Sequence, residues 1–299
     1  MPHPHHTCTP PGSIAAAPRP LLWRKAQNSL LGLFSFFSII IAVGGMGWIL
    51  QTVLEQGIGV ISLSFLTEPS KPYGELNAGI ANALLGTVLI AGLATLIAVP
   101  PGIAAGIYLA EFGKNSRFAA ALRFCANVMM GVPSIIVGLF IYVLIVIPSG
   151  HNSGFAGSVA LAVIMFPVIM RTTEDMLAMV PDTLRESALA LGMSRSRATL
   201  SIVARAARNG MITGVLLSLA RVSGETAPLL FTAMFADSWP TSFFSRPTAN
   251  MPVLINEYTM NSPFEQMNAA GWGAALIITL IILALNIGTR CLFRDPKNR

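Results

Sequence analysis

Two charged residues interrupt one of the most apolar parts of the sequence. In SLARVSGETAPLL, residues 218–230, Arg221 and Glu225 stand between the apolar runs GMITGVLLS and FTAMF. A charge at the centre of a bilayer costs roughly 3 kcal/mol on insertion scales. Residues four apart share one face of a helix, so both side chains are predicted to face the inside of a helix bundle or water. The pair is either an internal lock between helices or part of a path for an anion.

Arginine is the side chain best suited to an oxyanion, because its planar guanidinium donates two parallel hydrogen bonds to phosphate-like oxygens. Glu225 would then hold Arg221 in place, or compete with the anion and so release it. Pro228 lies within the same predicted helix and is expected to kink it near Gly224.

A second arginine with nearby carboxylates occurs in RTTED, residues 171–175. Arg171 with Glu174 or Asp175 repeats the helical spacing, so Arg171 and Glu174 are further candidates for a substrate path or a gating site. The alternative is an interfacial arginine, which extends its charged end from the cytoplasmic end of a helix toward water.

The elements that carry these residues are predicted to span a membrane. The chain has 299 residues, of which 54% are hydrophobic and 11% charged, whereas average globular domains have about 25% charged residues. A spanning helix needs about 20 mostly apolar residues. An all-α membrane protein with six transmembrane helices follows. The predicted spans are about 29–50, 84–110, 119–147, 155–178, 210–235 and 271–293.

Prolines fall inside two of these spans. Pro100-Pro101 and Pro133-Ser134 are each expected to bend a helix. A helix broken at such a point could instead direct backbone N–H groups toward an anion.

The positions of lysine and arginine predict the orientation. They gather before the first span, between spans two and three, between spans four and five, and after the sixth, while the remaining loops hold Lys71 and Arg246. Cytoplasmic loops carry an excess of these residues, so both termini are predicted to be cytoplasmic. Residues 1–28 then form a disordered cytoplasmic tail, and residues 51–80 and 236–270 form external loops. The net charge of +6 is a topology signal, so no nucleic-acid partner is expected.

The cytoplasmic loop 179–209 is predicted to fold as helix, turn and helix. Thr183 followed by Glu186 is a capping-box pattern, Gly192 is suited to a helix C-cap, and Ser194 to the N-cap of a second helix. Both ends of the loop are tethered at the bilayer, which argues against a DNA-binding helix-turn-helix. The loop is either a connector without a partner or a docking helix for a cytoplasmic protein.

Several stretches resemble a known family. Glu186-Ser187-Ala188 followed by Gly192 resembles the EAA loop of ABC importer permeases, with Ser187 in place of the first alanine. VPSIIVGLFIYV, VIMRTTEDML and ARVSGETAPLLFTA resemble the phosphate-specific, PstA-type permeases, and the likeness extends over about residues 50–295. Sulfate and molybdate permeases share the general pattern, so another oxyanion is the alternative substrate.

This resemblance implies a type I (MetI-like) ABC permease domain over residues 81–295, preceded by the first transmembrane helix at 29–50. It implies that Glu186, Ser187, Ala188 and Gly192 couple the chain to an ATPase. The expected function is import of inorganic phosphate across a bacterial inner membrane. The expected partners are a second related permease subunit, a cytoplasmic ABC ATPase dimer and an external phosphate-binding protein. No cofactor is expected in this chain, because the ATPase would use the ATP.

Motifs of other functional classes are missing from the sequence. It contains no G-x-x-x-x-G-K-[ST] loop, no H-E-x-x-H and no G-x-S-x-G, so an enzyme is not expected. A secondary transporter would need an internal repeat or more mid-membrane carboxylates, and an intramembrane enzyme would need a nucleophile and a base. His3, His5 and His6 belong either to a disordered tail or to a metal-binding tract, and no metal site is assigned.

Overall fold

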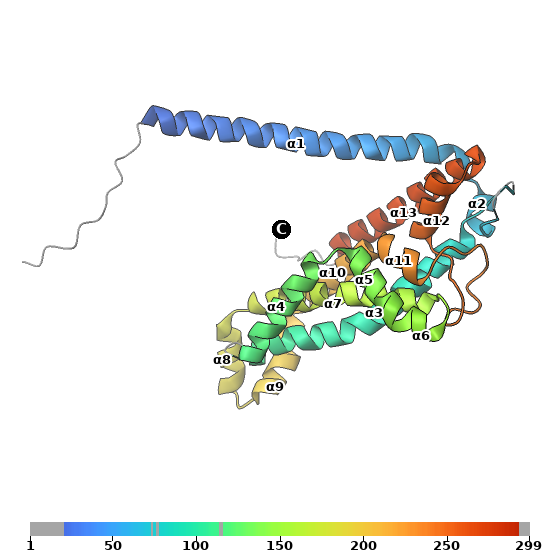
Figure 1. Cartoon of the computed structure of the whole chain (residues 1–299). Coiled ribbons are helices and arrows are strands. Elements are labelled where there is room, and N and C mark those ends of the chain that lie inside the picture. Colours follow the sequence, from blue (N-terminus) through green and yellow to red (C-terminus); the bar gives the residue numbers. More distant parts are fainter. Residues whose placement is uncertain (1–20, 73, 76–77, 114–115, 293–299) are drawn as a thin grey trace, which may run out of the picture. The chain divides into compact units, whose positions relative to one another are not determined.

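The fold is that of a computed structural model, which describes residues 21–292 apart from residues 73, 76–77 and 114–115. Within these residues every regular element is a helix (Figure 1), which confirms the predicted all-α class. The chain divides into two compact units, one that ends at Thr52 and one that begins at Val53. The tail histidines lie outside the described residues.

The helices in chain order are α1 (Leu21–Gly57), η1 (Ile58–Val60), α2 (Leu63–Thr67), α3 (Ala81–Ile107), η2 (Tyr108–Phe112), α4 (Arg117–Gly131), α5 (Ser134–Ile141), η3 (Tyr142–Val146), α6 (Ile147–Ser149), α7 (Gly154–Ala178), α8 (Asp182–Ala190), α9 (Arg195–Ala198), η4 (Thr199–Val203), α10 (Ala204–Val222), α11 (Ala227–Thr232), α12 (Met251–Asn256), η5 (Glu257–Asn261) and α13 (Glu265–Leu292).

The first helix, α1, is longer than the span predicted at residues 29–50. Its 37 residues correspond to about 55 Å at 1.5 Å per residue, more than the roughly 30 Å of a hydrocarbon core. It begins at Leu21, inside the predicted tail, because LLWRKAQN is rich in residues that favour helix.

The centre of the second unit is the packing of α3 against α7. Small residues recur at four-residue intervals on α3, and Ala94 and Ala98 are almost completely buried. At Gly106, which continues this row, an added Cβ would lie 2.5 Å from Cβ of Thr173. Small residues let two membrane helices approach closely. The helix continues through Pro100 and Pro101, so these prolines do not break it.

Among the described residues, four helices are long and apolar enough to cross a membrane, or five if a bent pair counts as one span. The bent pair joins 117–131 to 134–149 at an angle of 103°, so the bend predicted at Pro133 is confirmed. A count of six continuous spans is not confirmed, because the predicted span 210–235 is interrupted.

The interruption lies between α10 and α11. Helix α10 ends at Val222, and Pro228 lies in the first turn of α11. Proline lacks an N–H and clashes with the carbonyl four residues before it, here that of Gly224, whereas the first turn of a helix accommodates it. The expected kink is therefore a complete break, and the prediction of one helix over residues 210–235 was wrong.

The short helix α11 is held at its C-terminal end by two other loops. Its last carbonyls accept hydrogen bonds from donors in residues 152–153 and 248–250. The bonds run from Asn152 Nδ2 to Phe231 O (2.6 Å), Ser153 N to Thr232 O (3.0 Å), Thr248 N to Ala233 O (3.1 Å) and Asn250 Nδ2 to Met234 O (3.2 Å). These bonds satisfy carbonyls that a helix end leaves without partners, so the break is a fixed part of the fold.

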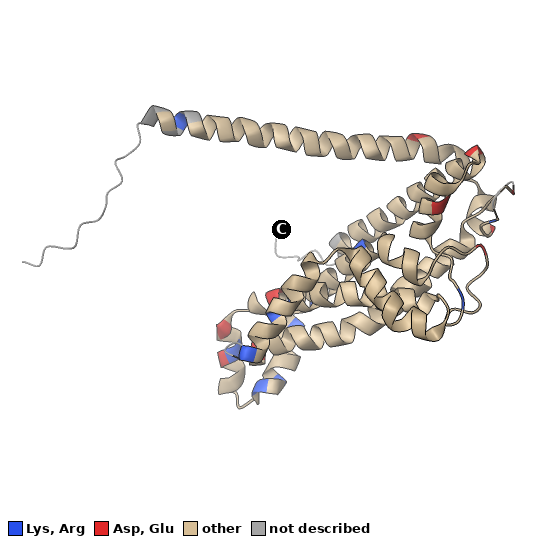
Figure 2. Ribbon diagram, in the orientation of Figure 1, with Lys and Arg blue, Asp and Glu red and all other residues tan. Residues whose placement is uncertain are grey.

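Charge is distributed unevenly over the second unit. Lysine and arginine gather around α8 and α9, whereas the opposite end carries mainly acidic residues (Figure 2). This matches the loop asymmetry of the sequence. The assignment of the α8–α9 end to the cytoplasm stays a prediction.

Candidate functional site

Arg221 and Glu225 face each other across the break that follows α10. Arg221 lies in the last turn of this helix and Glu225 in the turn beyond it. The Arg221 Nε to Glu225 Oε1 distance is 3.9 Å, which is too long for a hydrogen bond. The prediction that both residues share one helix face was wrong, because the helix ends between them, but the turn still brings their charges together.

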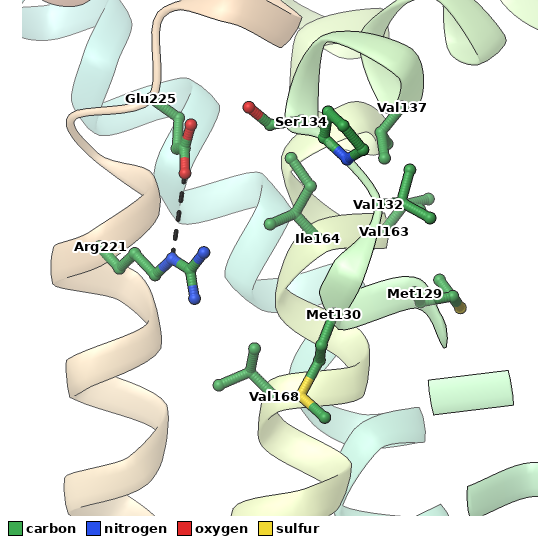
Figure 3. A pocket seen from close by; sticks show the side chains of 11 residues that line it. Met129, Met130, Val132, Ser134, Val137, Val163, Ile164, Val168, Arg221 and Glu225 are labelled. Atoms are coloured by element: carbon green, nitrogen blue, oxygen red, sulfur yellow. Dashed lines mark ion pairs between the residues drawn. The ribbon is translucent and has the colours of Figure 1, made fainter. Parts of the chain in front are cut away.

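Both side chains line a cavity of about 260 Å³. In Figure 3 the Arg221 side chain extends from α10 toward α7 and toward the break between α4 and α5. Ser134, the first residue of α5, adds a hydroxyl to the wall. The rest of the lining is apolar and consists of Met129, Met130, Val132, Pro133, Val137, Val163, Ile164 and Val168.

This cavity presents one cation to a small solute. A water molecule needs only about 10–15 Å³ of such space, so a small anion and several waters fit. The Arg221 side chain is 64% exposed and that of Glu225 is 22% exposed. The guanidinium has five N–H donors. In the part of the chain that the structure describes, none of these donors forms a hydrogen bond to Glu225. It can therefore donate two parallel bonds to an oxyanion.

Arg171 and Glu174 belong to a different cluster, farther along α7. Arg171 Nη1 lies 3.3 Å from Glu174 Oε2, and Arg171 Nε lies 3.3 Å from Asp175 Oδ1. Arg123, from α4, contacts the other Glu174 oxygen with its Nε at 2.6 Å. Its Nη2 also donates to Leu109 O at 2.9 Å. Glu174 is therefore held between two arginines.

The structure thus does not bring all four predicted path residues into one site. Arg171 does not line the cavity. Among the described residues of α7 that do, Val168 is the closest to Arg171 in sequence. The Glu174 side chain is only 11% exposed, and its contacts connect α4 to α7. Sequence reasoning missed Arg123, because its partner lies 51 positions away in the chain.

The loop 179–209 contains the predicted helix and turn. Gly192 has a φ of +80°, its N–H donates to Leu189 O at 2.9 Å, and Met193 N–H donates to Ala188 O at 3.3 Å. These two bonds form a Schellman motif, which confirms the glycine C-cap of α8. Glu186 and Ser187 are exposed on this helix, and Ala188 is buried.

The start of α8 differs from the prediction. Pro181 is the N-cap residue, and Thr183 lies inside the helix, where its carbonyl accepts a bond from Ser187 Oγ at 2.8 Å. The predicted capping box of Thr183 and Glu186 was therefore wrong. Asp182 in the first turn places a negative charge at the positive end of the helix dipole, which favours this earlier start. Ser194 is the N-cap of α9, as predicted.

Three residues absent from the sequence-based candidates form a further cluster, here called the Glu111 clamp: Glu111, Arg185 and Arg195. Arg185 Nη2 and Nε donate to Glu111 Oε1 at 2.8 and 3.0 Å. Arg195 Nη2 donates to the main-chain carbonyl of Glu111. The hydrogen bonds that Arg185 donates to Glu111 raise the pKa of Arg185, so this guanidinium is charged. A lone carboxylate at the end of an apolar run, in YLAEF, was the available sequence signal.

The sequence is similar to known membrane transport proteins. Residues 102–295 match the family described as binding-protein-dependent transport system inner membrane component. The phosphate transport system permease protein PstA of Haemophilus influenzae is 46% identical over 275 residues, which cover 92% of this chain and 96% of that protein. PstA of Yersinia pestis is 42% identical, with 92% and 93% covered. PstA 1 of Mycobacterium tuberculosis (strain H37Rv) is 36% identical, with 90% and 88% covered.

The fold is similar to solved structures of inward-facing conformations of the MetNI methionine ABC transporter. A native crystal form matches with a TM-score of 0.61 and 14% identity, over 72% of this chain and 94% of that chain. A second crystal form matches with a TM-score of 0.55 and 16% identity. At such identities the likeness concerns the fold alone.

Proposed function

We propose that this chain, which belongs to the PstA family of phosphate transport system permeases within the binding-protein-dependent transport system inner membrane components, is a membrane subunit that imports inorganic phosphate. The observation that carries the proposal is the cavity of about 260 Å³ that contains Arg221 and Glu225. It offers a guanidinium to an oxyanion between apolar walls, at a point where two helices are broken.

The geometry supports a transient anion site. A guanidinium that binds phosphate with its parallel N–H groups recognises it by shape as well as charge. Glu225 Oε1, 3.9 Å from Arg221 Nε, is close enough to compete for the guanidinium when the anion leaves. The helix α5 begins at Ser134 on the cavity wall. The N–H groups at a helix start lack the acceptor four residues earlier, and of those in this first turn Ile136 N–H donates to Pro133 O at 3.0 Å.

The exposure of Arg221 is the basis for expecting a second permease subunit. At 64% exposure, the Arg221 side chain is open to its surroundings as well as to the cavity, and hydrocarbon in contact with this charge would be costly. A related subunit would cover that side and complete the path. We assign the two permease subunits to the bacterial inner membrane. An external phosphate-binding protein would deliver the anion to their outer loops.

The helix α8 is the proposed contact with a cytoplasmic ABC ATPase dimer. Its exposed residues Glu186 and Ser187 are available to a partner, while Ala188 packs inward and Gly192 ends the helix. ATP would bind and react on the ATPase, so this chain itself is assigned neither a cofactor nor an enzymatic reaction.

Uptake of radiolabelled phosphate into proteoliposomes with the complete transporter tests the function. We expect ATP-dependent uptake that a hundredfold excess of sulfate or molybdate does not inhibit. Arg221→Gln should abolish it, whereas Arg117→Gln, which removes an exposed arginine at the start of α4, should not. Inhibition by sulfate or molybdate, or uptake of either in place of phosphate, would assign the chain to another oxyanion.

Labelling with an impermeant thiol reagent tests the orientation. Leu191 is 83% exposed and Met260 is 79% exposed, so a single cysteine at either position, in a cysteine-free background, is accessible to reagent. In intact cells we expect labelling at position 260 and not at 191, and the reverse pattern would overturn the assignment.

A further inference from the structure

The end of α3 carries a buried carboxylate that the anion cavity does not use. Glu111 lies in η2, which continues α3, and only 3% of the residue is exposed. A buried carboxylate is costly unless it is paired and hydrogen-bonded. Glu111 is therefore present for the contacts it makes, and these come from the cytoplasmic loop.

Arg185 supplies the first contact, from the second turn of α8. Besides its two bonds to Glu111 Oε1, it donates to the carbonyls of Leu177 (2.7 Å) and Val180 (2.6 Å). It also pairs with Asp182 at 3.0 Å. One guanidinium thus joins η2, the end of α7 and the start of α8.

Arg195 supplies the second contact, from the first residue of α9. It donates to the Glu111 carbonyl and lies over the Phe112 ring, 5.6 Å from its centre. Both α8 and α9 therefore hold the same residue, Glu111 of η2. The clamp also borders a cavity of about 220 Å³, and the π-helical turns η2 and η4 contribute to its wall. Such turns are frequent at functional sites.

The remainder of α3 is suited to transmit a displacement. Its small residues pack closely against α7, as described for Gly106. At its opposite end, Asn82 is completely buried, accepts from Ser70 N–H at 2.8 Å and donates to Ser238 O at 3.3 Å. Its 27 residues span about 40 Å at 1.5 Å per residue. One rigid helix thus connects the clamp to the outer loops.

We propose that Glu111 is a positioning residue that, through Arg185 and Arg195, fixes the coupling helix α8 to α3, so that movement of α8 is transmitted to the outer side of the protein. This inference rests on the proposed function, because it assumes that α8 receives the ATPase. Glu111 binds no substrate in this scheme. Its role is to convert movement of the loop into movement of α3.

The test compares Glu111→Gln and Arg185→Lys with Arg117→Gln in the reconstituted transporter. Glutamine keeps the size of Glu111 without its charge, and lysine keeps the charge of Arg185 without its planar fork. Phosphate uptake and ATP hydrolysis are measured on the same vesicles. We expect both clamp variants to lower phosphate carried per ATP hydrolysed by about tenfold or more, with hydrolysis retained. Arg117→Gln should leave the ratio unchanged.

A spin label at position 191, just beyond α8, reports the clamp without reference to phosphate. In the cysteine-free permease, we expect both clamp variants to increase its mobility. If Glu111→Gln fails to assemble, Arg195→Gln, which leaves the Glu111–Arg185 pair intact, should still raise mobility and lower the ratio. Unchanged mobility and an unchanged ratio would overturn the clamp. If the wild-type transporter carries another anion, only the proposed substrate is refuted. The mobility of the label does not depend on the substrate, so it would still test the role of Glu111.

Discussion

Replacing both Arg221 and Glu225 by leucine separates an anion path from a structural lock. A lock contributes stability through the ion pair, and loss of both charges removes that contribution. A path residue contributes through bonds to the transported anion, and leucine makes none. The two roles therefore predict different losses, one in stability and the other in transport.

The geometry sets the size of each loss. The 3.9 Å separation and the 64% exposure of Arg221 are those of a weak pair, for which about 0–1 kcal/mol is typical. We therefore expect the double leucine variant to assemble at normal levels. Two charge-assisted hydrogen bonds to an anion contribute about 3 kcal/mol at the lower end of their range, which corresponds to roughly a hundredfold in rate or affinity.

The assay measures ATP-dependent phosphate uptake with permease levels determined in the same membranes. Arg221→Leu/Glu225→Leu should lower uptake by at least about a hundredfold. Arg221→Lys, which keeps the charge and loses the fork, should retain weak uptake. Near-normal uptake by the double variant would refute the path role and leave only the lock. Loss of the permease itself from the membrane would refute the estimate that the pair is weak.

Three further changes test other parts of the structure. Glu174→Gln leaves two arginines without their shared carboxylate and should lower the free energy of unfolding by about 3–5 kcal/mol, whereas Asp175→Asn, at a half-exposed side chain, should cost below about 1 kcal/mol; equal thermal shifts in detergent would contradict this. Gly106→Leu should destabilise the α3–α7 contact by about 1–3 kcal/mol. Gly92→Ala, where a Cβ meets open space among the described residues, should not lower the melting temperature, because alanine favours a helix more than glycine does. A melting temperature lowered by Gly92→Ala and not by Gly106→Leu would argue against the close packing. Gly192→Ala places a side chain at φ +80°, which costs about 1–2 kcal/mol. This variant should lower phosphate uptake per ATP hydrolysed, and an unchanged ratio would contradict the role of the glycine.

The sequence by itself determined the class of the protein and much of its local structure. Lipid offers backbone groups no partners, so a spanning segment must satisfy them within regular structure. Continuous apolar runs of about 20 residues have the length of a spanning helix and are too long for a spanning strand. Gly192 at a left-handed position and the bend at Pro133 follow from the chemistry of single residues, so both were predictable. The family resemblance was present in local strings such as GETAPLLFTA, and the MetI-like fold agrees with it.

Only the tertiary structure decided which charges meet. Arg123 reaches Glu174 across 51 positions, and Arg185 reaches Glu111 across 74, because packing of α4 and α8 beside other helices sets these distances. The break after Val222 also depends on its surroundings: donors from residues 152–153 and 248–250 satisfy the end of α11, which makes a short helix stable at that point. Local spacing predicted that Arg221 and Glu225 meet, but the turn and cavity that place them together come from long-range contacts.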